Sequence, residues 1–192
     1  MAKAGTHGVS ANTPKSILFG AGTIHKGLKY SGSKWNIEES IVGSTSGGSK
    51  LTIKPELKPI EIDGAVTNVK GLVAKIDEKA TLEVNFAELT KDIVTAATLG
   101  GAGTCEDASY DVIESKDGVV AGDYWENIGF VGKTLEGKLI IAILDNALCT
   151  SGLENEGKPK DNSVGKYVFE CHADPATGVE KLPWHIYYPK TL

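Results

Sequence analysis

Arginine is absent from this chain of 192 residues, so all of its 20 basic residues are lysines. Without a guanidinium group the protein has no bidentate clamp for phosphate or carboxylate and no reader of guanine edges. The formal net charge of −5 further weakens attraction to a phosphate backbone. The composition therefore argues against DNA recognition, although a gene that prefers AT-rich lysine codons would produce the same absence.

Cysteine is scarce. The chain has three cysteines, Cys105, Cys149 and Cys171, and they are widely spaced with no CxxC pair. An odd number at such spacing argues against both a structural zinc site and a disulfide framework. We expect all three to be buried, reduced thiols.

Long apolar runs are also missing. The longest, residues 139–144, is far too short to cross a bilayer. The first 16 residues contain no apolar stretch that could act as a signal peptide. We therefore expect a soluble protein that is made in the cytoplasm and has no membrane partner.

The residues that are plentiful point to a strand-and-turn protein. Hydrophobic residues make up 41% of the chain, which excludes a wholly disordered protein. The 23 glycines and 7 prolines are scattered between short apolar runs, as in β proteins with many turns. A length of 192 residues suits a single domain with a substantial core.

The most informative block is residues 58–92. Asp63-Gly64 and Lys70-Gly71 are turn signals between short stretches of alternating apolar and polar residues. Ala80, Leu82 and Val84 then alternate with polar residues, which predicts a strand with one buried face.

The period then changes to that of a helix. We predict a packed α-helix over about residues 86–98. Asn85 with Glu88 would form a capping box at its start, and Gly100-Gly101 would end it. The side chains expected to form its core face are Phe86, Leu89, Ile93 and Val94.

Further strands are predicted over residues 16–20, 29–30, from 35 onward, and over 109–114, 125–133, 138–148, 166–172 and 184–188. The run 139–144 is continuous, as expected of a strand buried on both faces, and a helix through Leu148 is the competing prediction. The predicted fold is mainly β: an antiparallel β-sandwich or small barrel with one packed α-helix.

Two segments are predicted to lack regular structure. Residues 1–15 read as a flexible N-terminal arm. Residues 43–58, rich in glycine and serine, read as a long inter-strand loop, either a mobile surface loop or one that a partner orders. As candidate assembly residues we take Gly43, Ser44, Thr45, Ser46, Gly47, Gly48, Ser49, Lys54, Pro55 and Glu56.

No motif for catalysis or ligand binding emerges. Residues 129–134 end in Gly-Lys-Thr like a P-loop, but Asn127 stands where the first glycine belongs, so a strand running into a turn is preferred. Cys171 and His172 are adjacent in a predicted strand and would point to opposite faces, not to one metal ion. We expect structural histidines, no cofactor, no catalytic or metal-binding residue, and no enzymatic activity.

Several of these segments, in their order, resemble the major tail tube proteins of long-tailed (siphovirus-type) phages and prophages of Gram-positive bacteria. The resemblance lies in the Ile-Asp-Gly-Ala turn at 62–65, the Lys-Gly-Leu at 70–72, residues 78–90, and the closing strand at 183–189. It implies a structural virion protein of the phage tail, made in the host cytoplasm.

The resemblance also implies partners. Subunits of that family form hexameric rings that stack into a hollow tube, with a long loop reaching a neighbouring subunit and DNA passing through the channel. Other partners would be the tail initiator or distal tail, tape measure and tail terminator proteins. Two alternatives stay open: the inner tube of a contractile tail, tailocin or type VI-like machine, and a β-sandwich module binding carbohydrate through aromatics such as Trp184, Tyr187 and Tyr188.

Overall fold

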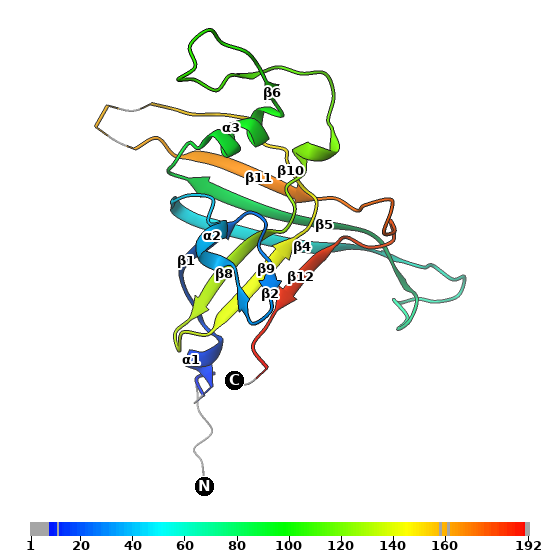
Figure 1. The fold of residues 1–192 in the computed structure, drawn as a ribbon. Helices are drawn as coiled ribbons and strands as arrows, with labels where there is room; N and C mark the ends of the chain where they lie inside the picture. The colour runs from blue at the N-terminus through cyan, green and yellow to red at the C-terminus, as the bar shows by residue number, and fades with distance from the viewer. Residues whose placement is uncertain (1–7, 11, 158, 161, 191–192) are drawn as a thin grey trace.

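The computed structural model describes residues 8–10, 12–157, 159–160 and 162–190. Two antiparallel four-stranded sheets form its body (Figure 1). The first sheet has the order β1 (Leu18–His25), β8 (Ile128–Thr134), β9 (Leu139–Leu144), β12 (Trp184–Tyr187). The second sheet has the order β10 (Ala147–Cys149), β11 (Gly165–Cys171), β5 (Val73–Phe86), β4 (Thr45–Pro59). The mainly β, antiparallel sandwich class predicted from sequence is confirmed.

Smaller elements complete the chain. They are α1 (Thr13–Ser16), β2 (Tyr30–Ser31), β3 (Lys34–Trp35), α2 (Ile37–Ser40), α3 (Lys91–Thr98), β6 (Gly101–Ala102), β7 (Ile113–Glu114) and the 3-10 helix η1 (Ala121–Asp123). Strands β2 and β3 pair with each other, as do β6 and β7.

The main core lies between the two sheets. Strand β5 contributes every second residue to it, and these are Ala80, Leu82, Val84 and Phe86. The neighbouring strand β11 adds Tyr167 and Phe169, and the first sheet adds Ile24, Ile128 and Leu144. Helix α3 buries Ile93, Ala96 and Ala97 in the same cluster. One face of the second sheet is therefore covered by both the first sheet and α3.

A second cluster covers the opposite face of the first sheet. Leu28, Val131, Ile141 and Ile143 are buried there, with Trp35 and Ile37 packed against them. Strand β9 is thus buried on both sides, as its continuous apolar run predicts. The competing helix through Leu148 is wrong, because the chain turns at Asn146 (φ 48°) and β10 then enters the other sheet.

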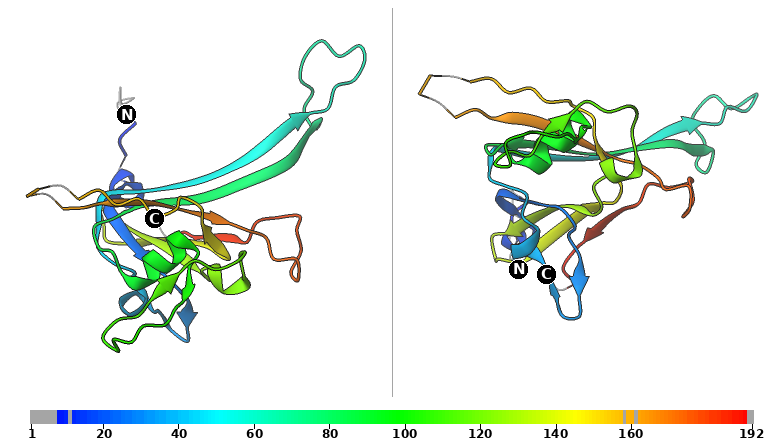
Figure 2. Two further views of the ribbon diagram at one scale, coloured as in Figure 1. Left: turned by 90° about the horizontal axis from the view of Figure 1, so that it is seen from above. Right: turned by 45° about the horizontal axis from the view of Figure 1, so that its top comes forward.

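Strands β4 and β5 are much longer than the sandwich needs. They stay paired as far as Pro59 opposite Val73, beyond the residues that contact the core. Figure 2 shows this hairpin curving away from the body and ending in a loop. The register shifts between Glu56 and Leu57, where Ile76 is the extra residue on β5. Bulges of this kind bend a strand pair.

The predicted helix is shorter than expected and starts later. Phe86 is the last residue of β5 and is buried there, because pairing with Gly165 of β11 keeps the strand extended to this point. The helix begins at Lys91, and its cap is Thr90, whose hydroxyl accepts a hydrogen bond from the Ile93 N–H. Leu89 lies outside it and is exposed.

The capping box predicted for the helix is likewise wrong. Asn85 pairs with Lys166 of β11, so it lies in a strand and cannot cap a helix. Glu88 instead accepts a hydrogen bond from the hydroxyl of Ser44. Of the predicted core face, Ile93 is buried and Val94 half-buried. The helix ends at Leu99, which adopts a left-handed conformation (φ 51°) one residue before the glycine pair.

The predicted loop over 43–58 is wrong, because Thr45–Pro59 is strand β4. Its glycine-serine segment forms a bulge, in which residues 46–48 stand between the pairs Thr45–Phe86 and Ser49–Val84. The predicted arm 1–15 falls partly outside the described residues (1–7 and 11), and its last part is helical in α1. The strand predicted over residues 16–20 is part of β1, which begins at Leu18 and continues through Gly20 and Gly22 to His25.

Two glycines in β1 allow a matched test of this packing. Gly20 (φ 91°) and Gly22 (φ 71°) both adopt positive φ, which costs an alanine about 1–2 kcal/mol. A Cβ at Gly20 would meet no atom within 4 Å, whereas one at Gly22 would lie 2.4 Å from the Phe130 ring. We expect Gly22→Ala to lower the free energy of unfolding by about 1–3 kcal/mol more than Gly20→Ala, in urea denaturation. Equal losses would contradict this packing.

Candidate assembly surface

The hairpin arm, defined as residues 57–76, is the part of the molecule that lies farthest from the core. Its own hydrogen bonds hold its tip: Ile60 N–H donates to Leu72 O (2.9 Å), and two turns follow. Ala65 N–H donates to Ile62 O (3.1 Å), and Leu72 N–H donates to Val69 O (3.1 Å). Both turns coincide with the Asp-Gly and Lys-Gly signals in the sequence, so those predictions are confirmed.

Large aliphatic side chains are exposed along the whole arm. Val66 at its tip is 99% exposed. The others are Leu57, Ile60, Ile62, Val69, Val73 and Ile76. A soluble protein seldom exposes so many large aliphatic side chains on one short hairpin, and such exposure marks a site of contact with another molecule.

The tip of the arm is also hollow. Residues 59–69 and Leu72 line a space of about 590 Å³ that the loop's own side chains leave unfilled. A two-stranded hairpin that projects into water is marginally stable, since it lacks a second layer to bury its apolar residues. The arm therefore has both the exposed surface and the unfilled space that a partner could cover.

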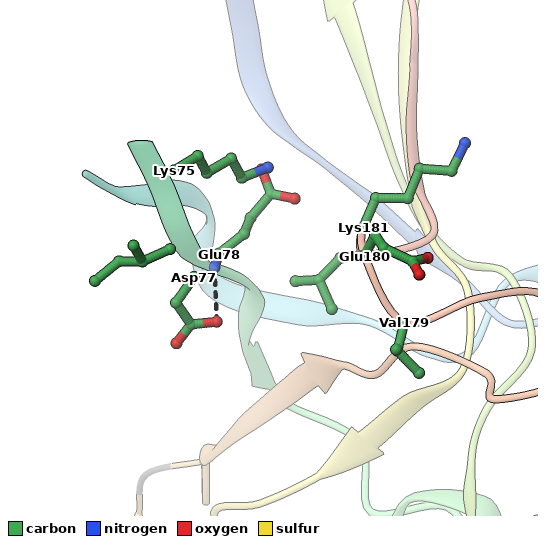
Figure 3. A pocket seen from close by; sticks show the side chains of 8 residues that line it. Lys75, Asp77, Glu78, Val179, Glu180 and Lys181 are labelled. Atoms are coloured by element: carbon green, nitrogen blue, oxygen red, sulfur yellow. Dashed lines mark hydrogen bonds and ion pairs between the residues drawn. The ribbon is translucent and has the colours of Figure 1, made fainter. Parts of the chain in front are cut away.

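A smaller cleft lies where the arm leaves the sandwich. It has a volume of about 230 Å³ and lies between residues 75–78 of β5 and residues 179–182 (Figure 3). Lys75 Nζ is 2.7 Å from Glu78 Oε1, and this pairing lowers the pKa of the Glu78 carboxyl. A carboxylate held ionised by a lysine is a poor general acid, so we assign this cleft no catalytic role.

The side chains of the second sheet that alternate with its core residues share one face, which we call the outer face; Lys50, Lys79 and Lys166 on it are 62–70% exposed. Register places Lys50 opposite Glu83 and Glu83 opposite Val168, so these side chains share it. Its remaining residues, by the same alternation, are Thr52, Lys54, Lys79, Thr81, Asn85, Leu148, Lys166 and Glu170. Unlike the arm, this face is mostly polar.

Ion pairs cross the strands of the outer face. Glu83 Oε1 lies 3.1 Å from Lys50 Nζ, and its Oε2 lies 2.7 Å from Lys166 Nζ. Lys79 Nζ lies 3.3 Å from Glu170 Oε2. Glu83 thus lies between lysines of both adjacent strands and Glu170 pairs with one lysine, so three of the four lysines on this face lie beside a carboxylate.

The candidate assembly residues from sequence do not gather at one surface. Gly43 and Ser44 lie beside Glu88, just before β4. The residues from Thr45 to Ser49 begin β4, at the opposite end of the strand from the arm. Lys54, Pro55 and Glu56 lie in β4 at the foot of the arm, opposite Lys79, Glu78 and Asp77. Only this last group adjoins the exposed aliphatic surface.

The true projecting segment starts where the predicted loop ended. The turn signals at 63–64 and 70–71 could have located it, because Val66 and Val69 lie between them and Ile60 and Ile62 just before them, more aliphatic residues than a solvated turn needs. From sequence alone, such aliphatic residues are predicted to lie in the buried face of a strand. Only the length of β4 and β5 relative to the sandwich reveals that they are exposed.

Aromatic side chains gather at the edge of the first sheet. Trp35 packs edge-on against Tyr30 (5.5 Å between ring centroids, 65° between planes) and against Tyr187 (4.7 Å, 70°). Sugar rings stack on flat aromatic faces. Because neighbouring rings here stand nearly perpendicular, they form no continuous flat platform for a carbohydrate.

The groups capable of chemistry are distributed without a shared site. Among the described residues no three His, Cys, Asp or Glu side chains are placed to hold a metal ion.

Cys149 and Cys171 are buried and free, and burial raises the pKa of Cys171 to about 12. Cys105 is exposed, so the expectation of three buried thiols is wrong for this residue. It lies in the long connection between β6 and β7.

The glycine-rich segment 129–134 is part of strand β8, which confirms the strand prediction over a P-loop. Gly129 is needed for packing, because a Cβ there would lie 2.4 Å from Leu28 Cδ2.

No helix in the described part of the chain is long and apolar enough to span a membrane. No protein-family model matches the sequence, and no curated protein matches it.

His25 is a buried structural histidine, and its surroundings give a pH-dependent prediction. Its Nδ1 bonds to Ser40 Oγ (2.9 Å) and its Nε2 to Thr23 Oγ1 (2.7 Å), so it ties β1 to α2. Burial lowers the pKa of His25 below its ordinary value of 6.5.

The folded protein therefore resists protonation of His25, whereas the unfolded chain accepts a proton below pH 6.5. We expect the free energy of unfolding to fall as the pH drops from about 7 to 5. In His25→Asn this fall should be smaller, although the variant should be less stable at pH 8 by about 1–3 kcal/mol. Urea denaturation at several pH values measures both. Parallel curves for the two proteins would refute this role.

Proposed function

We propose that this protein is the subunit of a self-assembling hollow tube, of the kind formed by tail tube proteins of long-tailed phages. Copies would associate into rings, hexameric according to the resemblance in sequence, and the rings would stack to form a channel for DNA. The observation that supports this most is the hairpin arm with its row of exposed aliphatic side chains.

The arm has features suited to contact between subunits. Fully burying one valine, leucine or isoleucine side chain is favourable by about 1.5–3 kcal/mol, and the arm offers several of them. The arm extends beyond its own core, so only another molecule can bury these side chains. In a homo-oligomer every subunit both offers an arm and receives one, which is the heterologous contact that rings and stacks require.

The sheet edges favour the same kind of association. Strand β4, at the edge of the second sheet, is 15 residues long, and β12, at the edge of the first, is exposed at Ile186 and Tyr187. Long open edges are sites where strands of other chains can add. Lys50, Lys54 and Pro55 on β4 would limit uncontrolled pairing before assembly.

We assign the outer face of the second sheet to the channel. It is polar and open, whereas the opposite side of the sandwich is covered by β2, β3 and α2. A channel for DNA must not bind phosphates tightly, and the carboxylates beside three of the four lysines of this face weaken such binding. The inner tube of a contractile tail, tailocin or type VI-like machine would have the same architecture, and a sheath gene next to this one would favour it.

The proposal predicts assembly that depends on the arm. Negative-stain electron microscopy of the purified protein over a concentration series should show rings or hollow tubes. Val66→Asp should prevent or strongly reduce them, because it places a charge where a partner would bury an aliphatic side chain. Size-exclusion chromatography should show that Val66→Asp and the unaltered protein have compact, folded subunits.

A matched control is Val119→Asp, which changes an exposed valine (49%) in the segment between β7 and η1, away from the arm. It should assemble like the unaltered protein. If both variants assemble normally, the arm is not the contact surface. If the protein stays a monomer at every concentration and binds polysaccharide, the tube proposal fails and a carbohydrate-binding module takes its place.

A further inference from the structure

Glu83 has an unusual position among the charges of the outer face. It lies on β5, the strand between β4 and β11, and reaches a lysine on each neighbour. Its two carboxylate oxygens contact Lys50 at 3.1 Å and Lys166 at 2.7 Å. One acidic side chain therefore contacts two lysines, which are 70% and 63% exposed, and its single negative charge offsets one of their two positive charges.

The lysines around Glu83 would otherwise form a cationic patch. Lys54 and Lys79 face each other on β4 and β5, and Lys79 is paired with Glu170. Neighbouring strands lie about 5 Å apart, and alternate residues of one strand about 7 Å apart. Four lysines on such a grid can reach several phosphates of a single nucleic acid backbone.

Net charge does not prevent this binding, because a local patch attracts a polyanion even on an acidic protein. The carboxylates within the patch are what oppose it. The pairing with Lys166 and Lys50 lowers the pKa of Glu83, so the side chain stays ionised in mildly acidic solution.

We propose that Glu83 determines how the outer face interacts with nucleic acid: by pairing with both Lys50 and Lys166 it keeps the sheet from binding a phosphate backbone. The inference rests on the proposed function, because it explains how a lysine-bearing channel would let DNA pass. The binding behaviour itself is a property of each single subunit.

The test uses a fluorescently labelled DNA duplex of mixed sequence and the purified full chain at low salt, with fluorescence anisotropy as the readout. The variant is Glu83→Lys. The matched control is Glu136→Lys, which makes the same change in net charge in the exposed turn between β8 and β9. We expect Glu83→Lys to bind DNA at least tenfold more tightly than either the unaltered protein or the control.

The salt dependence should separate a patch from a general charge effect. Each phosphate contacted contributes about −0.9 to the slope of log K against log salt concentration. With Lys50, Lys166 and the introduced lysine released to bind, we expect the slope for Glu83→Lys to steepen by about 2–3 units. The Glu136→Lys slope should change by less than about 1 unit.

Three results would overturn the inference: tight binding by the unaltered protein, equal gains in both variants, or no gain in Glu83→Lys. Circular dichroism checks folding. If Glu83→Lys does not fold, Glu83→Gln replaces it, with Glu136→Gln as its control. The expected gain in DNA affinity is then smaller. Failure of tube assembly would count against the proposed function alone. Failure of the binding test would count against the role of Glu83 alone, since neither readout depends on the other.

Discussion

The alternation of side chains along β5 is the constraint on which the rest of the structure depends. Its even-numbered residues from Ala80 to Phe86 hold the second sheet against the first, and they are nearly inaccessible to water. Its odd-numbered residues form the middle of the outer face. Because side chains alternate strictly along a strand, a register shift of one residue would bury Glu83 and expose Leu82.

The same strand also runs beyond the core. From Ala80 toward Val73 its only paired strand in the described structure is β4, and the bulge at Ile76 marks the change from sandwich to arm. The strand β5 is thus part of both the sandwich and the arm, and its apolar residues are buried in the first and exposed in the second. In the sandwich the apolar residues are covered by the protein itself, whereas in the arm they are covered only if another molecule supplies the surface.

The distinctive features of this molecule are therefore its surfaces and not its pockets. Many of the charged side chains described above are engaged in pairs, as in Lys75 with Glu78 at the arm's base and Lys79 with Glu170 on the outer face. The cleft at the arm's base is small and contains such a pair. What distinguishes the molecule is an apolar projection at one end of β4 and β5 and a polar sheet face with cross-strand ion pairs.

Sequence by itself determined the fold class and the core of β5 and β9, because burial on one or both faces leaves a period that can be read in the residues. It also located the turns at 62–65 and 69–72, where glycine chemistry is local. It misplaced the helix start, because pairing with β11 extends β5 through Phe86, and that pairing joins residues far apart in the chain. It misplaced the loop for the same reason, since glycine and serine at 46–48 are a bulge only when β5 lies alongside. Whether an isoleucine in the arm is buried or exposed, and whether Glu83 meets two lysines, depends on strand length and register, which only the tertiary structure decided.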